Sequence, residues 1–412
     1  MLEYAFNSES EDKWYDGDAE SEGGNGEEGS FVELDADLFY LSASKDLSVI
    51  NSNRYFQSRV QKKSKLNIFE EDLLTIFSNE EYWKTAREFK NKYRCSRDSL
   101  EAIALEIQGH TVFEAKRKSG AKQAPVKHQL MTLLNYMGHE GSTNMTQAGL
   151  FRIGSGTCED YRNRAKTAIL SLRDKYIFWP DEEERRQLAK SNEEKYHCPN
   201  AILYGDGTLH ELMLAPQTPD RGDYHGRKMQ WSLATLILGD DECRVRYYLS
   251  GFPGCSHDNR VWRWSKIYKE KEKYFSPLQY VIMDTAFEPR DIYVPTYKKQ
   301  SVPDPDKEKF NTTVAKYRVK SEHLNGISKG RFPGALRRIR KVITKDIKSL
   351  EEILSYIECA FILHNMLIDL RDADDGEELE DEWKEALDEE YTDIDDPNRG
   401  DPDAAHYTSP EL

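Results

Sequence analysis

The chain has 412 residues, which allows two domains plus tails, and its formal net charge of −16 is unevenly distributed. Residues 1–37 hold 13 acids and 1 base, and residues 371–412 hold 18 acids and 3 bases. Residues 38–370 therefore keep 54 bases against 43 acids, a net charge of about +11 that suits a polyanionic partner. The acid-rich tails predict disorder. They either keep the chain soluble or compete with DNA for the basic part, and we favour the first interpretation.

Cysteine spacing and hydropathy exclude several classes of protein. The six cysteines form no CxxC pair, so neither a zinc knuckle nor a disulfide framework is indicated. Free thiols fit a reducing compartment. The N-terminus is acidic where a signal peptide needs basic and apolar regions, and no apolar run approaches membrane-spanning length. We expect a soluble intracellular protein that does not associate with membranes.

Changes of pattern along the chain predict five regions. They are an acidic, mostly disordered tail, a helical DNA-binding domain, a connecting helix, an α/β catalytic domain and a second acidic disordered tail, with expected bounds 1–60, 67–175, 176–198, 199–370 and 371–412.

The helical region has the element order of a helix-turn-helix. A helix that Pro125 opens is followed by a short helix at 143–153, a glycine-containing turn and a basic helix at 158–172. The basic residues of this last helix are candidates for DNA contact: Arg162, Arg164 and Lys166. A helical subdomain with a solvated basic face is the alternative, and the positive charge of the central part favours DNA binding.

Strand-like segments begin after Pro199 and are expected at 201–205, 211–215, 229–238, 243–250 and 280–283. The first of them runs into Tyr204-Gly205-Asp206-Gly207-Thr208. Glycines let the backbone bend and approach closely, so a carboxylate between them is placed to hold a hard cation. An Asp-Gly hairpin turn is the alternative, and this stretch taken alone favours the turn.

Two further acids strengthen the cation hypothesis. Asp284 follows the apolar strand 280–283, and Glu322 lies on a helix whose apolar stripe is Phe310, Val314, Tyr317 and Leu324. Strands that end at one edge beside a packed helix would bring these acids to Asp206. Clustered carboxylates repel one another unless cations lie between them, and Mg²⁺ and Mn²⁺ prefer such oxygen ligands. Two ions about 3.5–4 Å apart can promote in-line displacement at phosphorus.

Each acid also has a simpler interpretation. Asp284 could cap the following turn, and Glu322 could pair with Arg318 one helical turn earlier. Asp258 is a rival site residue, because it also follows a strand and begins a helix. With His257 beside it, it is better interpreted as a helix N-cap.

Seven short motifs follow one another between residues 199 and 370. They are Asp206-Gly207-Thr208, Tyr224-His225-Gly226-Arg227-Lys228, Gly251-Phe252-Pro253-Gly254 with His257-Asp258, Met283-Asp284-Thr285-Ala286-Phe287, Arg318-Val319-Lys320-Ser321-Glu322-His323, Lys329-Gly330-Arg331-Phe332 and Leu363-His364-Asn365-Met366-Leu367. In this order they resemble the PIF/Harbinger group of DDE transposases, a domain that also occurs in Harbinger-derived host nucleases. Phe287, where Tyr is common, and Met283, where Gly is frequent, are the departures.

The resemblance implies an RNase H-like mixed sheet with flanking helices, preceded by an all-α helix-turn-helix domain. It implies Asp206, Asp284 and Glu322 as the catalytic and metal-binding triad for two divalent cations, Mg²⁺ or Mn²⁺, with His257 and Asp258 as accessory residues. Basic residues of the motifs and of the 158–172 helix are the expected DNA contacts: Arg162, Arg164, Lys166, Arg227, Lys228, Arg318, Lys329 and Arg331.

The function implied is that of a nuclear Harbinger-type transposase. It would cut phosphodiesters at the ends of its element and join the freed 3′-hydroxyls to target DNA, as a homo-oligomer and with a Myb-like partner protein. A domesticated DNA- or chromatin-binding protein and a non-transposing metal-dependent nuclease are the alternatives. The basic stretches 117–122 and 336–341 would contact phosphate or direct nuclear import, and a solvated face explains them equally well.

Overall fold

A computed structural model describes residues 79–114, 123–226, 229–284, 292–295, 297 and 304–372, with the side chains of 79–85 left aside. The expected tails lie outside the described residues apart from Arg371 and Asp372, as do the basic stretch 117–122, Arg227, Lys228 and Phe287.

The first part of the described chain is helical. Its elements are α3 (Asn79–Tyr93), α4 (Arg97–Ile107), η1 (Thr111–Phe113), α5 (Val126–Met137), α6 (Asn144–Phe151), α7 (Ser155–Leu170), α8 (Arg173–Tyr176) and α9 (Glu182–Tyr196). Side-chain caps fix several helix starts, because an oxygen before the first turn accepts a backbone N–H that has no partner within the helix. The Ser96 hydroxyl accepts from the Ser99 N–H, and Thr143 forms a reciprocal capping box with Thr146.

A six-stranded mixed sheet forms the second part. Its strands are β1 (Ala201–Leu212), β2 (Ser232–Gly239), β3 (Val245–Pro253), β4 (Tyr280–Met283), β5 (Tyr293–Pro295) and β6 (Arg338–Ile339). The spatial order is β3-β2-β1-β4-β5, with β6 paired to β1. The pairs β1–β2 and β2–β3 are antiparallel, and the pairs β1–β4, β4–β5 and β1–β6 are parallel. The predicted α/β class, with a mixed sheet and flanking helices, is confirmed.

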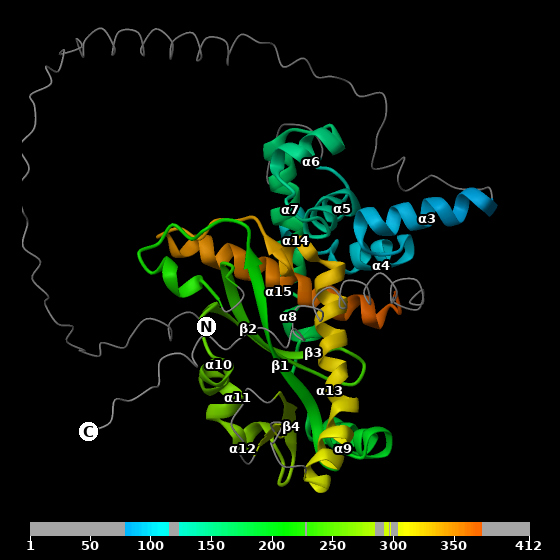
Figure 1. Cartoon of the computed structure of the whole chain (residues 1–412). Coiled ribbons are helices and arrows are strands. Elements are labelled where there is room, and N and C mark those ends of the chain that lie inside the picture. Colours follow the sequence, from blue (N-terminus) through cyan, green and yellow to red (C-terminus); the bar gives the residue numbers. More distant parts are fainter. Residues whose placement is uncertain are drawn as a thin grey trace, which may run out of the picture. The chain divides into compact units, whose positions relative to one another are not determined.

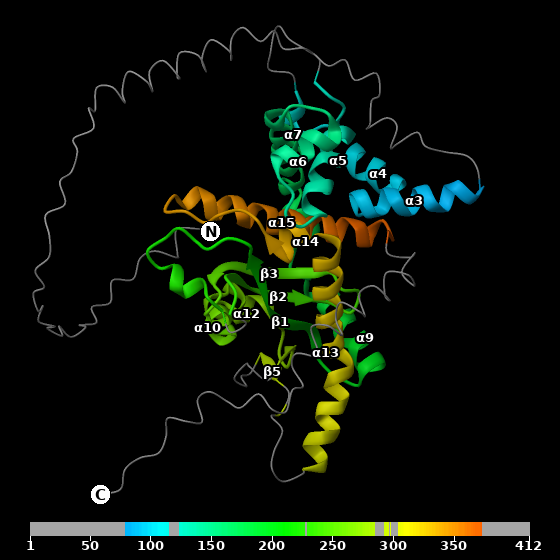
Figure 2. The same ribbon diagram turned by 45° about the horizontal axis from the view of Figure 1, so that its top comes forward.

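Helices cover both faces of this sheet (Figures 1 and 2). Successive side chains of a strand point to opposite faces. Tyr204 accordingly belongs to the core that includes α13 (Pro305–Arg331) and α15 (Ile347–Asp369), whereas Leu203 belongs to a second core. The helices α10 (Asp258–Trp264), α11 (Lys266–Lys269) and α12 (Lys271–Tyr274) supply residues to the second core, and η2 (Arg221–Tyr224) and α14 (Pro333–Leu336) complete the elements.

The first strand corrects one prediction. Instead of two strands joined by a turn at Asp206, β1 runs continuously through it, and Asp206 pairs with Ile237 of β2. The hairpin-turn alternative is therefore wrong. The glycines are tolerated within the strand because their neighbours fill the space that side chains would occupy. A Cβ on Gly205 would lie 2.5 Å from Leu238 and from the Met283 sulfur.

Gly205→Ala should therefore overpack this part of the sheet. Both neighbours are buried, so we expect the free energy of unfolding to fall by about 1–3 kcal/mol. Gly149→Ala on α6 is the matched control, since a Cβ there meets nothing within 4 Å. It should be neutral or stabilise by up to about 1 kcal/mol. Urea unfolding of both variants tests this, and equal stabilities would contradict the packing described for Gly205.

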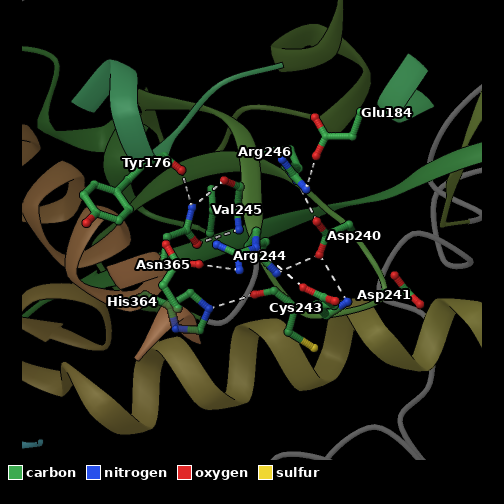
Figure 3. Close-up of polar contacts among 12 residues, drawn as sticks. Tyr176, Glu184, Asp240, Asp241, Cys243, Arg244, Val245, Arg246, His364 and Asn365 are labelled. Atoms are coloured by element: carbon green, nitrogen blue, oxygen red, sulfur yellow. Dashed lines mark hydrogen bonds and ion pairs between the residues drawn. The ribbon is translucent and has the colours of Figure 1, made fainter. Parts of the chain in front are cut away.

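The Leu363-His364-Asn365-Met366-Leu367 motif ties α15 to the start of β3 (Figure 3). The Asn365 amide exchanges hydrogen bonds with the backbone N–H and C=O of Val245, and also donates to the Tyr176 carbonyl, each at 2.8–2.9 Å. The His364 ring lies 2.8 Å from the Cys243 carbonyl. Both side chains are buried and bond to backbone groups, Asn365 through its oxygen and its nitrogen and His364 through Nε2, so this motif has a structural role.

The ends of the described chain are joined. The carboxylate of Asp372 accepts from the Ser96 N–H at 2.9 Å and from the Ser99 hydroxyl at 2.8 Å, at the start of α4.

All described residues fall within one compact unit. All six cysteines are free thiols. Among the described helices, none is both long and apolar enough to cross a membrane.

Candidate active site

The strand register brings Asp206 and Asp284 together. Tyr204 of β1 is level with Ile282 of the parallel strand β4, so positions 206 and 284, two residues further along each strand, are also level. Pairing with β4 stops before Asp206, while pairing with β2 continues past it. Asp206 therefore lies inside a strand but at the edge where its parallel neighbour ends.

The helix α13 carries four polar residues at helical spacing toward this edge: Arg318, Glu322, Asn325 and Lys329. Of the apolar residues predicted for the helix, Val314, Tyr317 and Leu324 are buried and Phe310 is half-buried. The amide nitrogen of Asn325 donates to the Asp206 carboxylate at 2.8 Å. This bond fixes α13 against β1 and brings Glu322, one helical turn before Asn325, to the same edge of the sheet.

Arg318 links the other two acids. Its guanidinium lies 2.9 Å from the Glu322 carboxylate and 4.0 Å from that of Asp284. The predicted pairing of Arg318 with Glu322 is thus present, and the same guanidinium also lies near Asp284. Arg318 supplies positive charge where two carboxylates approach each other.

Asp258 is a fourth carboxylate at this site. It is the first residue of α10, whose N-cap is His257, so the prediction that Asp258 is the N-cap is wrong. A Cβ on Gly207 would lie 2.3 Å from the Asp258 carboxylate oxygen, so the close approach requires glycine at 207. His257 is exposed.

The environment of Asp206 disfavours its ionised form. Burial, followed by the charges of Asp284 and Asp258, raises the pKa of Asp206 to about 7, against the opposing effects of the Gly207 N–H and Lys329. The common cause is negative charge held close together with little water. A bound cation would reverse it.

No group of three or more His, Cys, Asp or Glu side chains in the described part of the chain is arranged closely enough to hold a metal ion. The donor set nevertheless fits a hard divalent cation in chemical type, because it consists of carboxylates with an adjacent amide. The raised pKa of Asp206 and the ion pairs of Arg318 both indicate an edge that needs positive charge.

Two of the predicted DNA contacts on α7 are corrected, because Arg162 and Lys166 are buried. Arg162 donates to the Gln147 side chain at 2.6 Å and lies over the Tyr136 ring. Lys166 donates to the Ser355 hydroxyl at 2.8 Å. They connect α7 to its neighbours and cannot reach phosphate in this arrangement. The amphipathic pattern is reversed, since the exposed residues of α7 include Glu159, Asp160 and Asn163.

The other predicted DNA contacts among the described residues differ in their exposure and in their partners. Arg331 is also buried, 4% exposed, so the prediction that it contacts DNA is wrong for this arrangement. Arg164 and Lys329 are half-buried, and the charge of Lys329 acts on Asp206. Arg318 is occupied by acids of the site.

Asn325 is the site residue that the sequence analysis missed. Its spacing from Glu322 could have identified it, because residues three apart on a helix share a face.

A family model matches the part of the chain that holds the candidate site. Residues 206–365 match the family described as DDE superfamily endonuclease, so a DDE superfamily endonuclease domain occupies this part of the chain. The matched segment begins at Asp206 and ends at Asn365.

Among solved structures, the chain is similar to "Crystal structure of a pre-cleavage Mos1 transpososome", with 12% identity and a TM-score of 0.17. The similarity covers 71% of this chain and 84% of that one. No curated protein matches the sequence.

Proposed function

We propose that this protein is a Harbinger-type DNA transposase with an RNase H-like catalytic domain. It cleaves phosphodiesters at the ends of its element and joins the freed 3′-hydroxyls to target DNA. The convergence of Asp206, Asp284 and Glu322 at one edge of the sheet is the observation that carries the proposal. The strand order β3-β2-β1-β4-β5, antiparallel on one side of β1 and parallel on the other, supports the fold assignment.

In this proposal Asp206, Asp284 and Glu322 hold two divalent cations, Mg²⁺ or Mn²⁺. When bound, such cations supply Lewis-acid chemistry at a phosphodiester. The residues fit this role because Asp206 gains from any positive charge that offsets Asp284 and Asp258.

The neighbouring residues orient and balance the acids. Asn325 occupies one carboxylate oxygen of Asp206 and so fixes the direction of the other. Arg318 neutralises Asp284 and Glu322 in the present arrangement, and it can exchange these carboxylates for a DNA phosphate once cations are bound.

The partners follow from the reaction. Double-stranded DNA, as element ends and as target, is the substrate, and the proposal includes a nuclear location, a homo-oligomer and a Myb-like partner protein. The helices α5–α7 keep the order of a helix-turn-helix, but the outward residues of α7 are acidic or neutral. The main phosphate contacts are therefore assigned to another surface, described below.

A strand-transfer assay tests the proposal. The full chain is incubated with labelled element ends and a plasmid target, with magnesium or with chelator. Nicking followed by joining, both lost in chelator, is the expected result. Nicking without joining would indicate a metal-dependent nuclease instead, and DNA binding without nicking would indicate a domesticated DNA-binding protein.

Asn325→Ala should slow nicking by about 10–100-fold, as expected when a residue that orients a metal ligand is lost. Asn311→Ala is a matched control on the same helix, because Asn311 bonds only to the backbone of Tyr297 among the contacts of the described chain. It should nick at the parent rate. Equal rates for the two variants would remove Asn325 from the site.

A further inference from the structure

The helices α10–α12 carry a concentration of positive charge beside the acid cluster. Residues 259–274 contain six bases and two acids. Five of the bases are exposed: Arg260, Arg263, Lys266, Lys269 and Lys273. Here, unlike on α7, the basic side chains lie on the surface of the molecule. We call these five residues the α10–α12 basic surface.

The packing of α10 explains why the charges point outward. Val261 and Trp262 are buried in the core beneath the sheet, and Trp262 packs its ring against Tyr293. On a helix, positions 260, 263 and 264 share the face opposite to 261 and 262. Arg260, Arg263 and Trp264 are therefore held outward by a rigid element.

The surface also presents an aromatic ring. Trp264 is 42% exposed, and the Lys269 ammonium lies 4.6 Å from its ring centroid. An exposed indole among cations is an arrangement with which proteins bind single-stranded nucleic acid, because the ring stacks on bases while the cations meet phosphates.

Its position relative to the acid cluster is fixed by Asp258. That residue begins α10 and lies against Gly207, next to Asp206. From Asp258 to Trp264 the helix rises about 9 Å, which corresponds to about three base pairs along a duplex. A strand cleaved at the acids would therefore have its flanking phosphates over α10 and α11.

The basic stretch at residues 336–341 is less suitable for binding DNA phosphates. Arg337 and Arg338 lie 3.8 and 3.6 Å from the Glu140 carboxylate, and Lys341 pairs with Glu352. Three of its bases are thus in ion pairs, and on the α10–α12 basic surface Lys273 pairs with Glu270.

We infer that the α10–α12 basic surface binds the phosphates of the DNA that flanks the bond to be cut. This rests on the proposed function and adds the surface along which the substrate lies. The structure supports DNA over an acidic protein through the adjacent acid cluster and the exposed indole.

The test compares two double variants of the full chain with the same change in charge. Arg260→Gln with Lys266→Gln alters the α10–α12 basic surface. Arg186→Gln with Lys190→Gln alters two exposed bases of the acid-rich helix α9, which lies on the other side of the strands in Figures 1 and 2. Binding to a labelled mixed-sequence duplex is titrated in chelator across a range of salt concentrations. Thermal melting confirms that both variants fold.

The Arg260→Gln, Lys266→Gln variant should bind the duplex more weakly than the parent. The slope of log affinity against log salt should become smaller by about 2, one for each lost phosphate contact. The α9 variant should keep the parent slope. Equal slopes for the two variants would overturn the inference. The inference would also be overturned if the Arg260→Gln, Lys266→Gln variant lost binding to anionic lipid vesicles but kept its binding to DNA. Nicking by the parent is measured separately in magnesium, so a parent that nicks DNA while the slopes stay equal leaves the proposed function standing.

Discussion

Asp206→Asn should abolish DNA nicking while leaving the protein folded, with a loss greater than about a hundredfold. The substitution keeps the size of the side chain and an oxygen that can accept from Asn325, but it removes the charge needed to hold a cation. Magnesium should raise the melting temperature of the parent and have much less effect on the variant, because only a cation that binds the folded state stabilises it.

The same variant should alter how stability depends on pH. In chelator, the pKa of Asp206 is about 7 in the folded protein, against 3.8 as its ordinary value. Between these values the folded state holds more protons than the unfolded state, so the free energy of unfolding of the parent falls as pH rises. The variant lacks this titration and should exceed the parent by on the order of 2 kcal/mol at pH 8, allowing for solvent screening.

Chemical unfolding at pH 4.5 and pH 8 measures this difference. The gap between variant and parent should be small at the lower pH and larger at the higher one. A variant that is less stable than the parent at pH 8 in chelator, yet still nicks DNA, would show that Asp206 is a structural residue.

Arg162→Ala should lower the free energy of unfolding by about 2–4 kcal/mol, because buried hydrogen bonds to a charged group are lost and the side-chain oxygen of Gln147 loses its donor. Packing on the Tyr136 ring is lost as well. Arg164→Ala, two residues further along α7 and half-buried, is the matched control and should change stability by about 0.5 kcal/mol or less.

DNA binding distinguishes this role from the one that the sequence indicated. The folded Arg162→Ala protein should keep the salt dependence of the parent, since Arg162 makes no phosphate contact in the arrangement described. A stable variant with a reduced salt slope would mean instead that α7 binds DNA through Arg162.

The α/β class and the candidate acids could be predicted from sequence because they depend on local patterns. Runs of apolar residues identify strands, and the apolar stripe of α13 fixes the face that carries Glu322. The continuity of β1 through Gly205 and Gly207 could not be predicted, because it depends on Leu238, Met283 and Asp258 filling the space beside the glycines.

The burial of basic residues on α7 also could not be predicted from the sequence. Arg and Lys normally lie at the surface, so a basic helix predicts a solvated face. Arg162 is buried because Gln147, Asn144 and the Tyr136 ring form a site for its guanidinium, and these residues come from other helices. The expected tails lie outside the described residues and remain predictions.

The contact of Asp372 with α4 has a consequence for how the chain folds during synthesis. The Ser96 N–H and the Asp372 carboxylate are separated by 276 residues. At about 5–20 residues per second, a ribosome needs roughly 14–55 s to pass from one to the other. The N-terminal helices therefore emerge long before the residue that completes their packing. A nascent chain that has not yet reached Asp372 leaves the start of α4 open to chaperones.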